Sequence, residues 1–398
     1  DLRGEGGALL RALRHFCAYH DVALRPSVRE HLRAQLSTSG GRQATLELSQ
    51  LLRLPHTSPP PYVDLTPRRL SAHLDGTMQA PPRQPLASVP EVRAVAAAMS
   101  CCGGVASVHA VDVRLSEDCV TALGEALRYS PRLATLSLNH VLPNTASARA
   151  ALGVLIDALP RCRAPLTSLD LAHNALLEEA TLLRLVAALR TLPSALHSLN
   201  LDGCGLAPRS VLPLCALLCE PAWSSKLWSL SLAHNSLGKD DGTHALAQTL
   251  RRTTALLELD VTGAHLDLAA VVDALVSNET LATQLSLLHL GTNKLSRAAA
   301  LQLAEFVSLS RALRGLGISR TQLLPEGFEP ILAAALANPN LDGLALDASE
   351  NELGERCAKA IAQHLLGAAK TPAQRRLGSA GGGAAGGAAG GAAAANGD

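Results

Sequence analysis

Two histidines are the first side chains in this sequence that could bind a ligand, because His173 and His234 occupy the same place in two copies of the phrase Leu-Ala-His-Asn. Imidazole is a common metal ligand, but neither histidine has a second ligand close to it in the sequence. A second pair, Cys215 and Cys219, shares one helical face. Leucines alternate with these cysteines, so we predict that the cysteines pack in the core and that the histidines are solvated turn residues. The sequence therefore indicates no metal site.

The acidic segment Gly238-Lys-Asp-Asp-Gly242 superficially resembles a phosphate or metal loop. The alternative interpretation is a turn followed by the start of a helix, where aspartate is a favoured cap and carboxylates suit the helix dipole. The sequence carries no Walker-type phosphate loop, no His-Glu-x-x-His and no Gly-x-Ser-x-Gly. We therefore predict a protein that is not an enzyme and needs no cofactor.

These residues belong to a phrase that recurs every 28 to 33 residues, most clearly at 166–176 and 227–237. A fixed period of this length is typical of a leucine-rich repeat solenoid. Alternating leucines of each copy are expected to point into the core from a short strand, and replacing one of them with alanine should cost about 2–5 kcal/mol. The asparagine that follows can bond backbone groups where the chain leaves the strand. Cys204 and Thr321 take its place in two copies.

Between these strands the apolar period changes to about 3.6 residues, which predicts helices, for example across 182–189 and 268–275. Prolines are expected to stop the helices before the next strand, at Pro131, Pro193, Pro221 and Pro339. Because a helix is wider than a strand, the stack must curve. The predicted fold class is α/β, a leucine-rich repeat solenoid shaped as a ribonuclease-inhibitor-like horseshoe with parallel strands inside and helices outside.

The inner face of this horseshoe carries the functional prediction. Its outward strand positions are polar and acidic in the middle of the array and become small at Gly315 and Gly317. One interpretation is an ordinary solvated sheet face, since exposed strand residues are mostly polar. The other is a carboxylate stripe for a basic protein partner, because solenoids offer rigid concave faces. The candidate partner-binding residues are Asp170, Asn200, Asp202, Ser231, Glu258, Asp260 and His289.

The composition argues against other kinds of binding. The chain of 398 residues has a net charge of +1 and only 2% aromatic residues, so it lacks the basic field and stacking rings that nucleic-acid binding needs. Its nine cysteines lack the paired spacing of a disulfide framework, which predicts a reducing, cytoplasmic compartment. There is no uninterrupted apolar run of about 18 residues, so any membrane association is expected to be indirect or to depend on regions absent from this chain.

The sequence divides into four predicted regions. Residues 1–40 are expected to form a helical connector, and residues 41–104 a degenerate first repeat with a proline-rich insertion. Within that insertion, the Pro-Pro-Pro-Tyr run at 59–62 matches a WW-domain ligand. Residues 105–370 are the predicted repeat domain. Residues 371–398 are mostly alanine and glycine, which predicts disorder.

The segment Arg14-His-Phe-Cys17, followed by Leu24-Arg-Pro-Ser-Val-Arg-Glu30, resembles the connector that leads into the leucine-rich repeats of the CARMIL family, the linkers of actin capping protein and myosin-I. The stretched copy at 341–354 is similar to a late repeat of that family. The resemblance spans most of residues 8–366. It implies a regulator of actin filament assembly whose repeats dock actin-assembly factors at the plasma membrane or cell cortex. The family's basic capping-protein-binding motif is not visible here, so no site residue is carried over.

Two other classes fit the repeat pattern. The first is a GTPase-activating protein of the Ran type, for which Arg209, Arg251 and Arg320 are candidate catalytic arginines. Such proteins typically end in an acidic tail, whereas this chain ends in alanine and glycine. The second is the ligand-sensing repeat array of an innate immune receptor or a ribonuclease-inhibitor-like protein.

Overall fold

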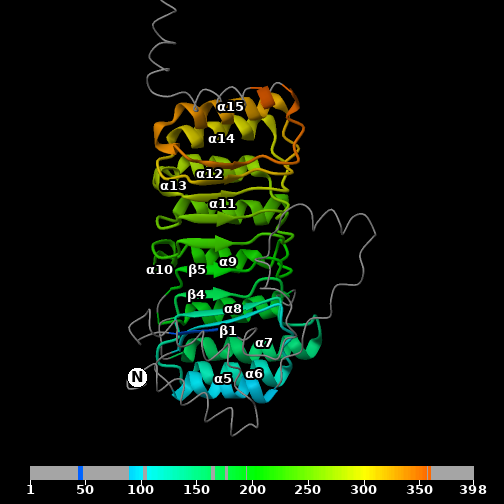
Figure 1. Ribbon diagram of the computed structural model, residues 1–398, viewed down its shortest axis with the longest axis vertical. Helices are drawn as coiled ribbons and strands as arrows, with labels where there is room; N and C mark the ends of the chain where they lie inside the picture. Colours follow the sequence, from blue (N-terminus) through cyan, green and yellow to red (C-terminus); the bar gives the residue numbers. More distant parts are fainter. Residues whose placement is uncertain are drawn as a thin grey trace, which may run out of the picture.

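The computed structural model describes residues 44–47, 89–101, 105–162, 166–174, 178–193, 195–355 and 357–359. Within these residues ten strands form one parallel sheet whose strand order follows the chain from β1 to β10, and helices cover one face of it (Figure 1). The predicted α/β leucine-rich repeat solenoid is therefore confirmed. The predicted connector 1–40, the Pro-Pro-Pro-Tyr run and the tail 371–398 lie outside the described residues.

The strands are short, and most have three residues. They are β1 (Ala44–Glu47), β2 (Val105–Val111), β3 (Thr135–Asn139), β4 (Ser168–Asp170), β5 (Ser198–Asn200), β6 (Ser229–Ser231), β7 (Glu258–Asp260), β8 (Leu287–His289), β9 (Gly315–Gly317) and β10 (Ala345–Asp347). β1 pairs with β2, as expected of a degenerate first strand.

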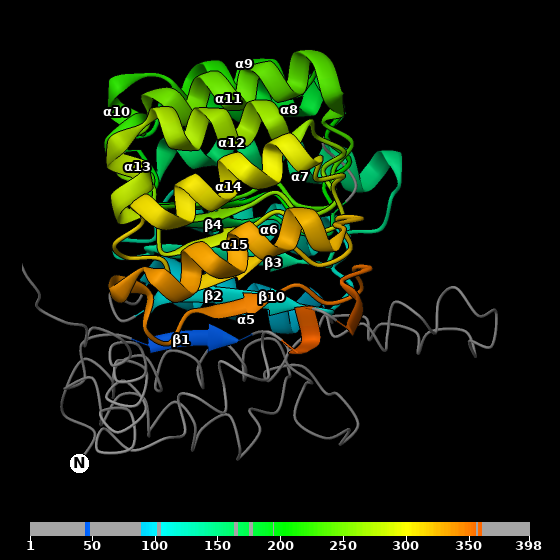
Figure 2. The same cartoon turned by 90° about the horizontal axis from the view of Figure 1, so that it is seen from above.

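Helices connect successive strands on the outer side of the sheet. They are α5 (Val89–Cys101), α6 (Glu117–Leu127), α7 (Ala146–Ala158), α8 (Glu179–Arg190), α9 (Val211–Leu218), α10 (Pro221–Ser224), α11 (Thr243–Arg252), α12 (Leu268–Ser277), α13 (Glu279–Gln284), α14 (Arg297–Leu309) and α15 (Pro325–Ala337). Seen along the stack, the middle coils are displaced to one side of both ends, with the helices on the convex side (Figure 2). The predicted horseshoe curvature follows from this arrangement.

The core lies between the sheet and the helices, and the strand leucines supply its inner layer. The register places the central leucine of each strand directly opposite the next. Each of these leucines is at most 2% exposed. They are Leu169, Leu199, Leu230, Leu259, Leu288 and Leu316. One coil cannot bury this layer alone, so each coil depends on its neighbours.

An asparagine closes four of the coils between β2 and β10, as the repeat phrase predicts. Asn235 Nδ2 donates to the carbonyl of Leu201 in the preceding coil at 2.8 Å and to Leu232 in its own coil at 3.0 Å. Its Oδ1 accepts from the backbone N–H of Leu206 at 2.9 Å. These bonds satisfy backbone groups that the turn leaves without partners. Equivalent bonds are made by Asn174, Asn293 and Asn351, and Cys204 and Thr321 donate to backbone carbonyls from the same place in their coils.

The prolines depart in part from the prediction. Pro131 and Pro193 follow the ends of α6 and α8, as expected of residues that stop helices. Pro221 and Pro339 begin short helices, α10 and the 3-10 turn Pro339–Leu341. These two prolines also follow the ends of α9 and α15, as predicted. They can open a further short helix because the first turn of a helix does not use the N–H that proline lacks.

Candidate functional site: the inner face and its rim

The strand register gathers five of the predicted site residues into one row across the inner face. Successive strands place them opposite one another, at the last position of each strand. This inner row consists of Asp170, Asn200, Ser231, Asp260 and His289. All five are partly exposed. Glu258 lies in the neighbouring row, opposite Ser229 and Leu287, and is exposed.

Three members of the inner row also hold their own turns. The Oδ1 atoms of Asp170, Asn200 and Asp260 each accept a hydrogen bond from the backbone N–H two residues further on, at 3.0, 3.1 and 2.9 Å. Asp170 also accepts a hydrogen bond from Ser137 Oγ at 2.7 Å. Because asparagine fills this place in β5, the turn requires the oxygen and not the charge. The turns therefore do not depend on the negative charges of Asp170 and Asp260.

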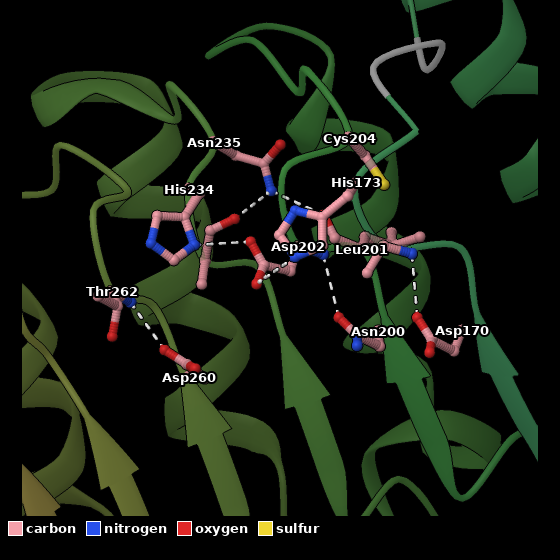
Figure 3. Close-up of polar contacts among 12 residues, drawn as sticks. Asp170, His173, Asn200, Leu201, Asp202, Cys204, His234, Asn235, Asp260 and Thr262 are labelled. Atoms are coloured by element: carbon pink, nitrogen blue, oxygen red, sulfur yellow. Dashed lines mark hydrogen bonds and ion pairs between the residues drawn. The ribbon is translucent and has the colours of Figure 1, made fainter. Parts of the chain in front are cut away.

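Asp202 is not where the sequence analysis put it. β5 ends at Asn200, and Asp202 lies in the turn beyond it, with a side chain only 12% exposed. Its Oδ1 lies 2.8 Å from His234 Nδ1, and its Oδ2 lies 3.7 Å from His173 Nε2 (Figure 3). The prediction of Asp202 as an outward strand residue is wrong, because the strand ends two residues earlier and the two flanking histidines engage its carboxylate.

The same contacts correct the interpretation of the histidines. His173 and His234 do lie in turns, but they are about one-third exposed and flank Asp202 from the coils on either side of it. The hydrogen bond to Asp202 raises the pKa of His234; burial opposes this change, and the charges of Asp202 and Asp260 add to it. His234 and Asp202 are thus electrostatically coupled to Asp260 in the inner row.

His173 and His289 can each extend over the next coil because a glycine there has no side chain. The residue before the coil-closing position has a positive φ in each coil from β2 to β10, and in the coil between the two histidines it is Gly203. A Cβ on Gly203 would lie 2.7 Å from His173 Nδ1. A Cβ on Gly317 would likewise lie 2.6 Å from Nδ1 of His289. A glycine one repeat after a histidine is the sequence signal that could have predicted these contacts.

Of the remaining candidate ligands and catalytic groups, Cys215 lies in the core and two of the three arginines form ion pairs. Cys215 is buried, as predicted, and burial raises its pKa to about 12. Arg251 pairs with Asp273, and Arg320 makes two contacts with Glu350. Within the described part of the chain, no group of three His, Cys, Asp or Glu side chains is arranged to hold a metal ion.

Arg209 lines an open groove of about 470 Å³ at the starts of the outer helices. The groove is also lined by Glu178, Glu179, Asp240 and Asp241. Its acidic segment is the one that the sequence analysis interpreted as a turn and helix start. The turn and helix start are confirmed, since Gly238–Gly242 forms a single π-helical turn that leads into α11, but neither helix has a side-chain cap from an aspartate.

Sequence reasoning missed the exposure of Trp228. Trp228, one of two tryptophans in the chain, is 49% exposed at the point where the chain enters β6. The other, Trp223, is buried. The leucines around Trp228 identify the repeat, but their spacing alone does not show which residue at the start of a strand stays exposed. No helix in the described ranges is both long and apolar enough to cross a membrane.

The stacked coils and the rigid inner face define a leucine-rich repeat protein, a fold that presents concave surfaces for protein binding. No family model matches the chain. Among curated proteins it is similar to Protein CARMIL of Dictyostelium discoideum, with 27% identity over 139 residues. That match covers 35% of this chain and 13% of the relative, so the chain spans only a small part of the length of that protein.

Solved structures give weaker similarities. The tropomodulin C-terminal domain of Caenorhabditis elegans matches with 12% identity and a TM-score of 0.30, over 53% of this chain and 96% of that domain. An internalin of Listeria monocytogenes matches with 17% identity and a TM-score of 0.35, over 67% and 79% of the two chains. A TLR13–ssRNA13 complex matches with 19% identity and a TM-score of 0.35, over 64% and 34%. At these TM-scores the matches carry no inference about this chain.

Proposed function

We propose that this chain is a non-enzymatic scaffold that regulates actin filament assembly at the plasma membrane or cell cortex by holding protein partners on its inner face. The observation that carries the binding role is the inner row with its neighbour Glu258, where carboxylates stand on a rigid sheet. The similarity to Protein CARMIL supports the link to actin. In that family the implied partners are capping protein and myosin-I.

The scaffold role is favoured over catalysis because two of the three candidate catalytic arginines are engaged. Arg251 and Arg320 each pair with a carboxylate from a neighbouring coil. Their ion pairs hold them at the surface of the array as structural groups. Acceleration of GTP hydrolysis by the GTPase Ran on addition of this chain would contradict this assignment and favour the activator class.

The test is direct binding of purified capping protein and purified myosin-I to the immobilised full chain. The informative variant is Asp170→Asn/Glu258→Gln/Asp260→Asn, which removes three charges and keeps the oxygen atoms that hold the turns. The matched control is Glu125→Gln/Glu279→Gln/Glu305→Gln, which removes three exposed carboxylates from the outer helices.

We expect at least one factor to bind, with an affinity about tenfold lower for the inner-face variant, since close charge pairs across an interface contribute roughly 1.5 kcal/mol or more. The control should bind like the unchanged chain. Failure of both factors to bind would contradict the actin assignment. Equal binding by the two variants would show that the carboxylates are a solvated sheet face.

A further inference from the structure

An apolar strip crosses the rim of the inner face beside its carboxylates. Trp228, Leu257 and Leu287 come from three successive coils, and we call them the rim strip. The backbone N–H of Leu257 donates to the carbonyl of Trp228 at 2.7 Å, and that of Leu287 donates to the carbonyl of Leu257 at 3.0 Å. Trp228 and Leu257 thus stand side by side in adjacent coils, about 4.8 Å apart. Leu287 stands one position further along the next strand, opposite Glu258, so the rim strip runs diagonally onto the inner face.

Local backbone geometry explains why Trp228 is exposed. The N–H groups of both Trp228 and Ser229 donate to the carbonyl of His197, at 2.8 and 3.1 Å. Two residues opposite one partner form a bulge, which takes Trp228 out of the alternation that buries Leu227 and Leu230. The His197 ring packs against the indole with ring centroids 5.1 Å apart. This contact limits the motion of the indole and so lowers the entropy cost of binding through it.

The other end of the rim strip lies over glycine. Leu287 is partly exposed and stands opposite Gly315 in β9. A Cβ on Gly315 would lie 2.7 Å from Leu287 Cδ2, so the leucine leans over the space that the glycine leaves. Together with Leu257, which is 36% exposed, it continues the apolar surface from the indole onto the inner face.

Negative charge borders this surface. Glu258 follows Leu257 directly and stands opposite Leu287, and it is exposed without an ion pair among the described residues. Asp260 lies two residues further along the same strand and uses one oxygen on its own turn. Arg314 follows one coil beyond Leu287 and gives that end of the strip a positive charge. The middle of the rim strip is therefore apolar and has carboxylates beside it. These negative charges disfavour binding of the phosphates of nucleic acids and lipids.

We propose that the rim strip anchors a segment of a partner protein that carries an aromatic or large aliphatic side chain close to a lysine or arginine. The apolar side chain would pack on Trp228 and Leu257, and the cation would meet Glu258. Tryptophan is enriched among residues that dominate binding energy, and an indole also attracts cations over its ring. The inference rests on the proposed role of the inner face in protein binding, but not on the identity of the partner.

The test is selection of a phage-displayed random peptide library on the immobilised full chain, with a parallel selection on Trp228→Ala. Selected peptides are then synthesised with a fluorescent label and titrated by anisotropy. We expect enriched peptides to combine an aromatic or aliphatic residue with lysine or arginine. Their affinity should fall about tenfold or more in Trp228→Ala and become less sensitive to salt in Glu258→Gln.

Two variants on the convex side serve as matched controls. Leu301→Ala removes a side chain on α14 that is exposed to the same extent as Trp228, and Glu305→Gln removes a carboxylate from the same helix. Both should leave peptide affinity unchanged. Trp228→Phe keeps an aromatic ring and should retain most of the affinity, which separates loss of the anchor from loss of folding.

Three outcomes would overturn the proposal. They are enrichment of acidic peptides, no enrichment relative to Trp228→Ala, and self-association of the chain that Trp228→Ala abolishes, which would make a second copy the occupant. Binding of capping protein or myosin-I that Trp228→Ala leaves intact would retain the proposed function and reject the rim strip. Selected basic and apolar peptides without binding of either factor would retain the rim strip and reject the actin assignment.

Discussion

Asp202 shows how one side chain links three coils of the solenoid. Its carboxylate lies between His173 of the preceding coil and His234 of the following coil, and Gly203 beside it leaves room for the first of these rings. Backbone bonds, buried leucines, the coil-closing asparagines and surface ion pairs also join the coils. A contact of this kind adds a dependence on protonation to a stack that is held together mainly by apolar packing.

This contact predicts a pH dependence of stability. The pKa of His234 is raised above its usual 6.5 in the folded chain, so protonation favours folding. The stabilisation should be complete below the unfolded pKa and should be lost as the pH rises through the folded pKa. Urea unfolding of the chain and of His234→Gln at about pH 5.5 and about pH 8.5 measures it.

The difference in free energy of unfolding between the chain and His234→Gln should be larger at the lower pH, by roughly 1 kcal/mol or less because the histidine is partly exposed. His265→Gln is the matched control, since His265 has a similar positive φ and is exposed. Gln322 shows that glutamine tolerates this backbone conformation. A difference that is the same at both pH values would contradict the coupling.

The connecting turns impose the tightest sequence requirements at the level of elements. In the π-helical turn Gly238–Gly242, a Cβ on Gly242 would lie 1.9 Å from the carbonyl oxygen of Leu237. Real side chains do not approach a backbone oxygen so closely, so the turn requires glycine. The turn also sets the direction in which α11 leaves the coil.

Gly242→Ala should therefore destabilise the chain by about 3 kcal/mol, the upper end of the usual cost of overpacking. Asp241→Ala changes the neighbouring exposed residue and should change stability by less than about 0.5 kcal/mol. Chemical denaturation of both variants measures this. Equal stabilities would mean that the chain forms a different turn here.

The sequence predicts those elements whose signals are local. The strands, the coil-closing role of asparagine at Asn235 and the core position of Cys215 could be predicted because each depends on the period of the phrase. The π-helical turn could not, since Gly238 to Gly242 fits an ordinary turn equally well. The contacts of Asp202 left a signal only in a glycine one repeat after a histidine. The exposure of Trp228 depends on a bulge between paired strands, which becomes evident only once the strands are aligned.

As a whole molecule, the solenoid has one apolar core that runs from coil to coil, but each coil contributes to it by packing on its neighbours alone. Leu230 lies near the middle of the stack, in β6, and is 2% exposed. A charge at this position would have no partner in the apolar layer formed by Leu199 and Leu259. Such a charge is expensive to bury, so it should separate the coils on either side.

Leu230→Asp should therefore replace one cooperative unfolding transition with separate transitions of the coils before and after β6. Hydrogen exchange measured by mass spectrometry would show early loss of protection around β6, with the flanking coils protected to different extents. Ser231→Asp places the same charge on the inner face one residue further on and should retain a single transition. A fully cooperative melt of Leu230→Asp would contradict the register.

The row-by-row register also determines how such a protein can change length over evolution. Every strand offers the same two inner-face positions, so loss or duplication of one complete copy of the phrase would leave each remaining residue in its own row. The separation between two features, such as Trp228 and the carboxylates of β4, would then change by whole steps of about 4.8 Å. A partial copy would instead offset the rows and bury polar side chains. The spacing of a binding surface in this fold is therefore inherited in discrete units, through gain or loss of entire repeats.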